Sequence, residues 1–154
     1  MSTFWTISGD AADPDRLARF WALALGYVDE PGYDEEDGAA LIDPDGVLPP
    51  ISFLRVPEAK TAKNRLHIDV RVPAGGPGDE GVRGQRIRDK AHELVAAGAT
   101  VVHEHTFDGA LDHIVMQDPE GNEFCVASRS AARRAPSTDQ ASGWCQSEAS
   151  AGDS

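Results

Sequence analysis

The chain has 154 residues, of which 40% are hydrophobic and 26% are charged, as expected for one soluble globular domain of ordinary size. Its net charge of −12 argues against a nucleic-acid partner, because the phosphates would be repelled. No apolar run is long enough for a transmembrane helix, and MSTFWTISGD lacks the basic region and apolar core of a signal peptide. We therefore expect a cytoplasmic protein without membrane or nucleic-acid partners.

The composition changes near residue 130. Residues 130–154 are rich in Ser, Ala and Gly and cannot bury enough apolar surface to offset the entropy lost on ordering. We predict one domain over residues 1–129, followed by a disordered tail. Cys125 lies in the apolar end of the domain and Cys145 in the tail, so we expect no disulfide and interpret Cys125 as a packed, inert residue.

The first half of the domain contains one clear helix signal. Asp13 is a good N-cap, Pro14 suits the first helical position, and apolar residues then recur at spacings of three and four. Gly26 is expected to end this helix. Strands are predicted before and after it, at Phe4–Ser8, Ala39–Ile42 and Ile51–Val56.

The second half follows the same order. In Arg65–Val72 the residues Leu66, Ile68, Val70 and Val72 alternate with polar ones, which predicts a strand. A helix is predicted from about Val82 to Ala97, with Ile87, Ala91, Leu94 and Val95 on its apolar face. Three further strands are predicted in ATVVHEHTF, HIVMQ and NEFCVA.

The two halves form an internal repeat. LIDPDG at residues 41–46 matches MQDPEG at residues 116–121, and a strand containing a Phe follows each turn. Aligning Phe53 with Phe124 places Ser52 opposite Glu123. Aligning the first strands places Thr6 opposite His67.

Three stretches in order, ADPDRLARFWALALGY, VPEAKTAKNRLHIDV and MQDPEGNEFCVA, resemble the vicinal oxygen chelate superfamily, in its glyoxalase-like, bleomycin-resistance-like branch. The resemblance covers about residues 3–128. It implies an α+β fold in which two βαβββ modules, at about residues 3–57 and 65–128, form an incomplete eight-stranded barrel around a cleft. It also implies a small-molecule ligand and a homodimer, because relatives often dimerise.

Enzymes of that family hold a divalent metal on the first and last strands of each module, so the resemblance points to His67 and Glu123 as metal ligands and catalytic residues. The ion would be Zn, Fe, Mn or Ni. The matching first-half residues are hydroxyls, so the set is one ligand short of a catalytic zinc site or an iron triad. His103, His105 or His113 could complete it. Without a metal, His67 and Glu123 could form an acid–base pair, with the pKa of Glu123 raised by its apolar neighbours.

Four residues are predicted to bind substrate. Trp5 and Phe53 are candidate aromatic walls of the cleft. Arg65 could clamp a substrate carboxylate, and His113 could point into the cleft.

Three functions are compatible with this sequence. The first is a glyoxalase-like protein that binds a small metabolite, either without further chemistry or as a metal-assisted lyase, isomerase or dioxygenase. The second is a non-catalytic protein that sequesters a drug or natural product. The third is a structural or regulatory module without a ligand.

Overall fold

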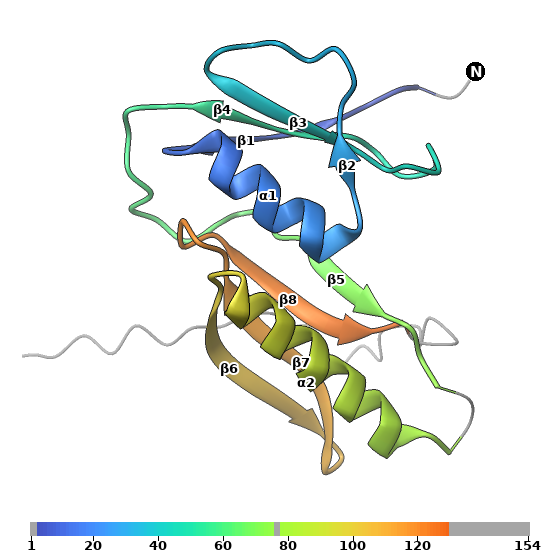
Figure 1. The fold of residues 1–154 in the computed structure, drawn as a ribbon. Helices are drawn as coiled ribbons and strands as arrows, with labels where there is room; N and C mark the ends of the chain where they lie inside the picture. The colour runs from blue at the N-terminus through green and yellow to red at the C-terminus, as the bar shows by residue number, and fades with distance from the viewer. Residues whose placement is uncertain (1–2, 76–77, 130–154) are drawn as a thin grey trace, which may run out of the picture.

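The computed structural model describes residues 3–75 and 78–129, which form two helices and eight strands in two similar halves (Figure 1). The first half contains β1 (Ile7–Ala11), α1 (Pro14–Leu25), β2 (Val28–Asp29), β3 (Gly38–Ile42) and β4 (Ile51–Arg55). The second contains β5 (Asp69–Val72), α2 (Glu80–Ala96), β6 (Thr100–Phe107), β7 (Ala110–Gln117) and β8 (Glu123–Ser128). The predicted tail and Cys145 lie outside the described residues.

Each half forms its own four-stranded sheet. The strand orders are β1-β4-β3-β2 and β5-β8-β7-β6, with the first and last strands of each half parallel and the other pairs antiparallel. Each helix packs on its own sheet (Figure 1). The two sheets do not close on each other, which confirms the predicted α+β fold of two βαβββ modules in an incomplete barrel.

Helix α1 begins and ends as predicted. The Asp13 side chain accepts a hydrogen bond from the Arg16 backbone N–H at 3.1 Å, and Gly26 adopts a left-handed conformation with φ of 74°. In α2, Ile87, Ala91 and Leu94 are buried as expected. The prediction for Val95 is wrong, because its side chain is 43% exposed.

Two predicted strands begin too early. β1 begins at Ile7 rather than Phe4, and β5 begins at Asp69 rather than Arg65. The linker between the modules, residues 57–65, folds over the start of β8, where Asn64 Nδ2 donates to the Glu123 carbonyl at 3.4 Å. The β5–β8 ladder therefore begins only at Asp69, and Leu66, which was predicted to lie in this strand, precedes it and is 89% exposed. The two-residue strand β2 is too short to show an alternating pattern and was not predicted.

One hydrophobic core spans both halves. Phe20 and Trp21 of α1 contact Phe124 of β8, with ring centroids 5.8 and 5.2 Å apart in edge-on geometry. The modules are therefore packed together by aromatic side chains from both halves of the sequence.

The turn before β8 also joins the modules. The buried Asp118 carboxylate accepts from Trp21 Nε1 at 3.1 Å and from the backbone N–H groups of Glu120 and Asn122 at 2.9 Å each. The Glu120 carboxylate accepts from the backbone N–H groups of Ala12 and Asp13, just before α1, at 2.6 and 3.1 Å. These bonds tie the second module to the start of the first helix.

The equivalent turn of the first module stays local. Asp43 accepts from the backbone N–H groups of Leu48, Asp45 and Val47 at 2.8, 3.1 and 3.0 Å. These bonds, led by that from Leu48, hold the pKa of Asp43 below its ordinary value. The repeated Asp thus stabilises its own turn in each half, but only Asp118 reaches the other module.

Three of the five histidines cluster on β6 and β7. His105 pairs directly with His113 across the two strands, and their rings stack with centroids 4.5 Å apart. The ring centroid of His103 lies 4.2 Å from that of His105. Burial lowers the pKa of His105, and the neighbouring His113 and His103 lower it further, against a smaller opposing effect of Asp112.

Replacing Asp118 should test the connection between the modules. We expect Asp118→Ala to lower the free energy of unfolding by about 2–3 kcal/mol, because buried donors lose a charged acceptor. The matched variant Asp43→Ala should cost less, since its donors are near solvent. Urea denaturation of both variants measures the difference, and equal losses would contradict the joining role of Asp118.

The pKa of His105 predicts a pH dependence of stability. An unfolded chain takes up this proton near pH 6.5, whereas the folded protein resists it until a lower pH. The contribution of His105 to stability therefore falls as the pH drops from 6.5 toward its folded pKa. An NMR titration of the ring should show the lowered pKa, and His113→Ala should raise it. No change in His113→Ala would contradict the proposed coupling.

Candidate functional site

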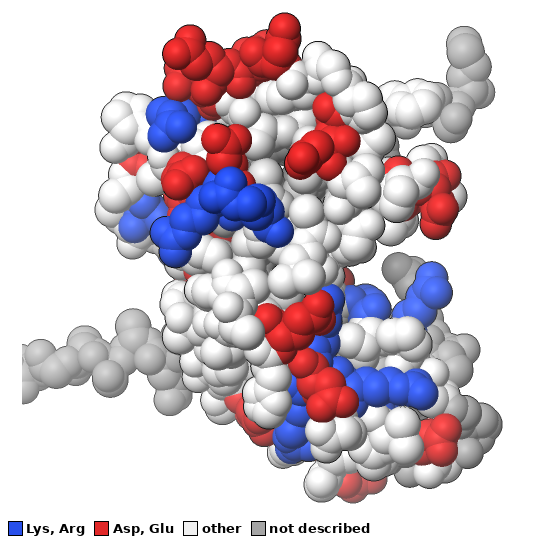
Figure 2. Space-filling view, viewed as in Figure 1, with Lys and Arg blue, Asp and Glu red and all other residues white. Residues whose placement is uncertain are grey.

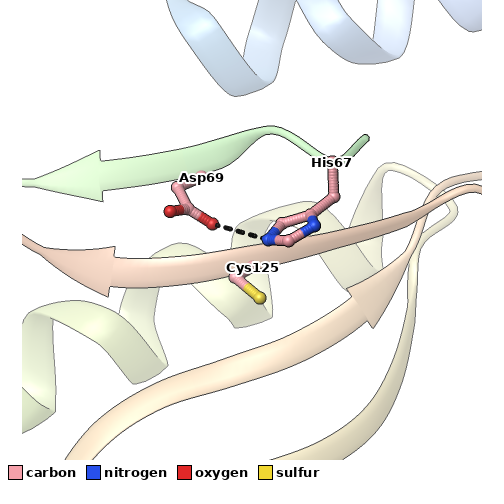
Figure 3. A group of neighbouring side chains, drawn as sticks. All are labelled: His67, Asp69 and Cys125. Atoms are coloured by element: carbon pink, nitrogen blue, oxygen red, sulfur yellow. Dashed lines mark ion pairs between the residues drawn. The ribbon is translucent and has the colours of Figure 1, made fainter. Parts of the chain in front are cut away.

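Three potential metal ligands meet on the second sheet. His67 precedes β5, Asp69 begins it, and Asp69 pairs with Cys125 of the neighbouring strand β8. One donor atom from each of the three lies within 4.8 Å of the other two, and the three side chains converge in Figure 3. Within the described ranges, these three form the one such group of His, Cys, Asp and Glu donors.

The group is open on one side. The side chains of His67 and Asp69 are 30% and 29% exposed, and His67 Nε2 lies 3.5 Å from Asp69 Oδ1. The other carboxylate oxygen of Asp69 accepts from Arg71 Nη2 at 2.9 Å. Cys125 is buried, as predicted, but its sulfur belongs to this donor group. Alternation could have identified it, because Cys125 and Glu123 are two residues apart and share a sheet face.

Glu123 is held by the linker instead. Lys60 Nζ lies 3.1 Å from both carboxylate oxygens, and the Asn64 backbone N–H donates to Oε2 at 3.0 Å. Burial alone would raise the pKa of Glu123, but the hydrogen bonds from the backbone, led by Asn64, and the Lys60 ammonium outweigh it. The pKa of Glu123 is therefore lowered, and the predicted raised pKa is wrong. Glu123 is a bound carboxylate rather than a proton acceptor poised near neutral pH.

Strand register corrects the alignment of the two halves. Leu41 pairs with Ile51, whereas the matching Met116 pairs with Phe124, so Ile51 rather than Phe53 is equivalent to Phe124. The reason is the longer connection between β3 and β4, which shifts the following strand by two residues.

The corrected register changes the comparison of ligand positions. Ser8 pairs with Ser52 as Asp69 pairs with Cys125, and Thr6 keeps its predicted place opposite His67. The first-half counterparts of the donor group are thus three hydroxyl residues, Thr6, Ser8 and Ser52. Ser8 and Ser52 hydrogen-bond to each other, with their Oγ atoms 3.0 Å apart.

The predicted substrate-binding residues are dispersed. Phe53 is 4% exposed and belongs to the hydrophobic core, so it does not form a cleft wall. Trp5 is 60% exposed just before β1, and Arg65 is exposed in the linker. His113 is half-buried on β7, whose neighbour β8 separates it from His67, and its Nδ1 lies 2.8 Å from Asp112 Oδ2. The contacts of Trp5, Arg65 and His113 with a substrate stay predictions.

Sequence reasoning missed a small hollow where the modules meet. It has a volume of about 190 Å³ and a mainly apolar lining of Ile7, Leu25, Tyr27, Leu48, Pro49, Ile51, Ile68 and Asp69. Asp69 is the charged residue in this lining and also belongs to the donor group. A second hollow of about 280 Å³ lies beside Lys60 and is lined by Ala12, Glu58, Ala59, Lys60, Glu120 and Asn122.

Acidic side chains gather away from this junction. Figure 2 shows them at the top of the molecule, over the loop that precedes β3, where residues 34–37 are exposed. These exposed carboxylates form a solvated acidic loop between the antiparallel strands β2 and β3. No helix in the described part of the chain is both long and apolar enough to cross a membrane.

Comparisons with known proteins agree with this architecture. A glyoxalase-like domain family matches residues 6–127. The fold is similar to that of a glyoxalase/bleomycin resistance protein/dioxygenase family enzyme from Burkholderia phytofirmans, with a TM-score of 0.59, 16% identity, and coverage of 80% of this chain and 95% of that chain. No curated protein matches the chain.

Two further solved structures have the same fold. One is a variant of the fosfomycin resistance protein FosX from Listeria monocytogenes, complexed with Mn(II) and 1S,2S-dihydroxypropylphosphonic acid; it has a TM-score of 0.61, 12% identity, and coverage of 85% of this chain and 93% of that chain. The other is a glyoxalase-related enzyme from Fulvimarina pelagi, with a TM-score of 0.57, 16% identity, and coverage of 84% and 89%. These likenesses concern the fold. Because the family match spans most of the sequence and both modules, this chain belongs to the glyoxalase-like domain family.

Proposed function

We propose that this protein binds a divalent metal ion through His67, Asp69 and Cys125, and uses it to hold a small organic molecule where the modules meet. The observation that carries the proposal is the convergence of three donor atoms within 4.8 Å (Figure 3). One nitrogen, one oxygen and one sulfur ligand are all donors that zinc accepts, and three is the number of protein ligands in a catalytic zinc site, which leaves a fourth position for water or a substrate.

The donor set favours zinc among the four ions expected from the sequence. Thiolate and imidazole suit zinc, whereas manganese prefers oxygen ligands. A non-heme iron triad needs two histidines and a carboxylate, and this group has one histidine. A bound zinc ion would supply a Lewis acid that polarises a ligand oxygen. Lyase or isomerase chemistry therefore fits these residues better than that of a dioxygenase.

The adjacent hollow suggests the kind of ligand. Its apolar lining favours a small, largely apolar molecule, and Asp69 places the donor group at its edge. The Tyr27 hydroxyl donates to the Pro49 carbonyl at 3.0 Å, and burial followed by the charge of Asp43 raises its pKa. Tyr27 thus adds a neutral wall. A molecule with one oxygen-bearing group would place that group at the ion and its apolar part in the hollow.

A second candidate is sequestration without catalysis. It is favoured by the first-half positions, where Thr6, Ser8 and Ser52 offer hydroxyls, which are poor metal ligands beside imidazole and thiolate. Such a protein would hold a drug or natural product in the same hollow. It would bind without turnover and without needing an ion.

We also propose a cytoplasmic homodimer. A reducing cytoplasm would keep the Cys125 thiol available as a ligand. The side chains of Trp5 and Leu66 are 60% and 89% exposed. Each residue lies two positions before an isoleucine that lines the hollow: Trp5 before Ile7, and Leu66 before Ile68. A second copy of the chain over this region would bury both side chains and cover the hollow.

Metal titration tests the first proposal. Metal-free protein should bind one Zn²⁺, and His67→Ala or Cys125→Ser should weaken zinc binding by at least about tenfold. Even the loss of a residue that only hydrogen-bonds to a metal ligand lowers metal affinity by about that factor. Co²⁺ should give a thiolate charge-transfer band that Cys125→Ser abolishes. His92→Ala, at an exposed position of α2, is the control that should bind normally. Protein that binds a small organic molecule equally well without metal would favour sequestration.

Light scattering tests the assembly. The dimer predicts twice the 16.4 kDa of one chain, and Trp5→Ser with Leu66→Ser should shift the protein toward monomers. Phe107→Ser at the end of β6, also an exposed apolar position, is a matched control that should leave the mass unchanged. A monomer at all concentrations would reject this part of the proposal.

A further inference from the structure

We infer that Lys60 withholds Glu123 from the metal ion and so determines which ion the site selects. The inference rests on the proposed metal site at His67, Asp69 and Cys125. It assigns to the linker, residues 57–65, a role in metal specificity.

The Lys60 ammonium forms an ion pair with the Glu123 carboxylate. Its ammonium lies 3.1 Å from both Oε1 and Oε2 of Glu123 and donates to the Ala62 carbonyl at 2.7 Å. The ammonium therefore contacts three oxygen atoms, two from Glu123 and one from Ala62. It occupies the place beside the carboxylate that a metal cation would need. The side chains of Lys60 and Glu123 are only 23% and 15% exposed, so solvent screens this pair less than an ordinary surface pair.

Glu123 would otherwise be well placed to join the donor group. It lies two residues before Cys125 on β8 and therefore on the same face of the sheet. The Asn64 backbone N–H holds its Oε2 from the linker side, so both oxygens have partners. Among the described residues, the donor group accordingly contains Asp69 and not Glu123.

Withholding one carboxylate changes the chemistry of the site. One nitrogen, one oxygen and one sulfur ligand suit zinc, whereas a second carboxylate would add the hard oxygen character that manganese prefers. A metal ion also gains affinity from each added anionic ligand. Neutralising Glu123 with an internal ammonium thus biases the site toward zinc and against manganese.

Calorimetric titrations of Mn²⁺ and Zn²⁺ into metal-free protein test this role. Lys60→Met removes the charge but keeps the length of the side chain, and should raise Mn²⁺ affinity by at least about tenfold because a carboxylate becomes available. Lys60→Arg is the matched control, since its guanidinium keeps a bidentate contact with the carboxylate and should give no gain. Adding Glu123→Gln to Lys60→Met should remove the gain.

The outcomes separate the inference from the proposed site. Zinc binding that depends on His67, with unchanged Mn²⁺ affinity in Lys60→Met, would overturn the Lys60 inference alone. No His67-dependent zinc binding by the original protein would overturn the proposed site and, with it, the inference that depends on that site. A large loss of zinc affinity in Glu123→Gln alone would show that Glu123 is already a ligand and reject the inference. Circular dichroism checks folding, and Lys60→Ala is the second variant if Lys60→Met does not fold.

Discussion

The arrangement of the two modules depends on a buried carboxylate. Asp118 is 3% exposed, and its charge is tolerated because an indole, two backbone N–H groups and the Asn122 side-chain amide donate to it. The indole belongs to Trp21, on the helix of the other module. Glu120, two residues later, holds the backbone that leads into the same helix. The turn that shapes the start of β8 thereby also positions the first module.

This connection determines where the candidate site lies. The turn ends at β8, so it places Cys125 next to Asp69 and leaves the linker to fold over Glu123. The hollow lies at the same junction, lined by residues from both modules. The turn before β8 thus determines both how the two halves pack and which side chains form the donor group.

The repeat conserves its framework and differs at its reactive positions. Both halves have a helix on a mixed sheet, and both use an Asp to stabilise the turn before the last strand. At the equivalent sheet positions, however, one half has hydroxyl groups and the other has imidazole, carboxylate and thiol. On β8 the changed position lies on the sheet face opposite Phe124 and Val126, whose apolar volume belongs to the hydrophobic core and must be kept. The second half has therefore become the candidate metal site without altering the fold.

The sequence by itself was sufficient for the α+β fold of two repeated modules and for the first helix. The Asp13 cap, the apolar spacing and Gly26 are local signals, and a repeated Asp-Pro turn indicated two copies of one unit. The sequence also identified His67 as a candidate ligand. It could not identify the partners of His67, because pairing a residue on one strand with a residue far along the chain depends on strand register. The tertiary structure brought Asp69 and Cys125 to His67, moved Phe53 into the core and joined Lys60 to Glu123, since loop length and the folded linker decide which side chains meet.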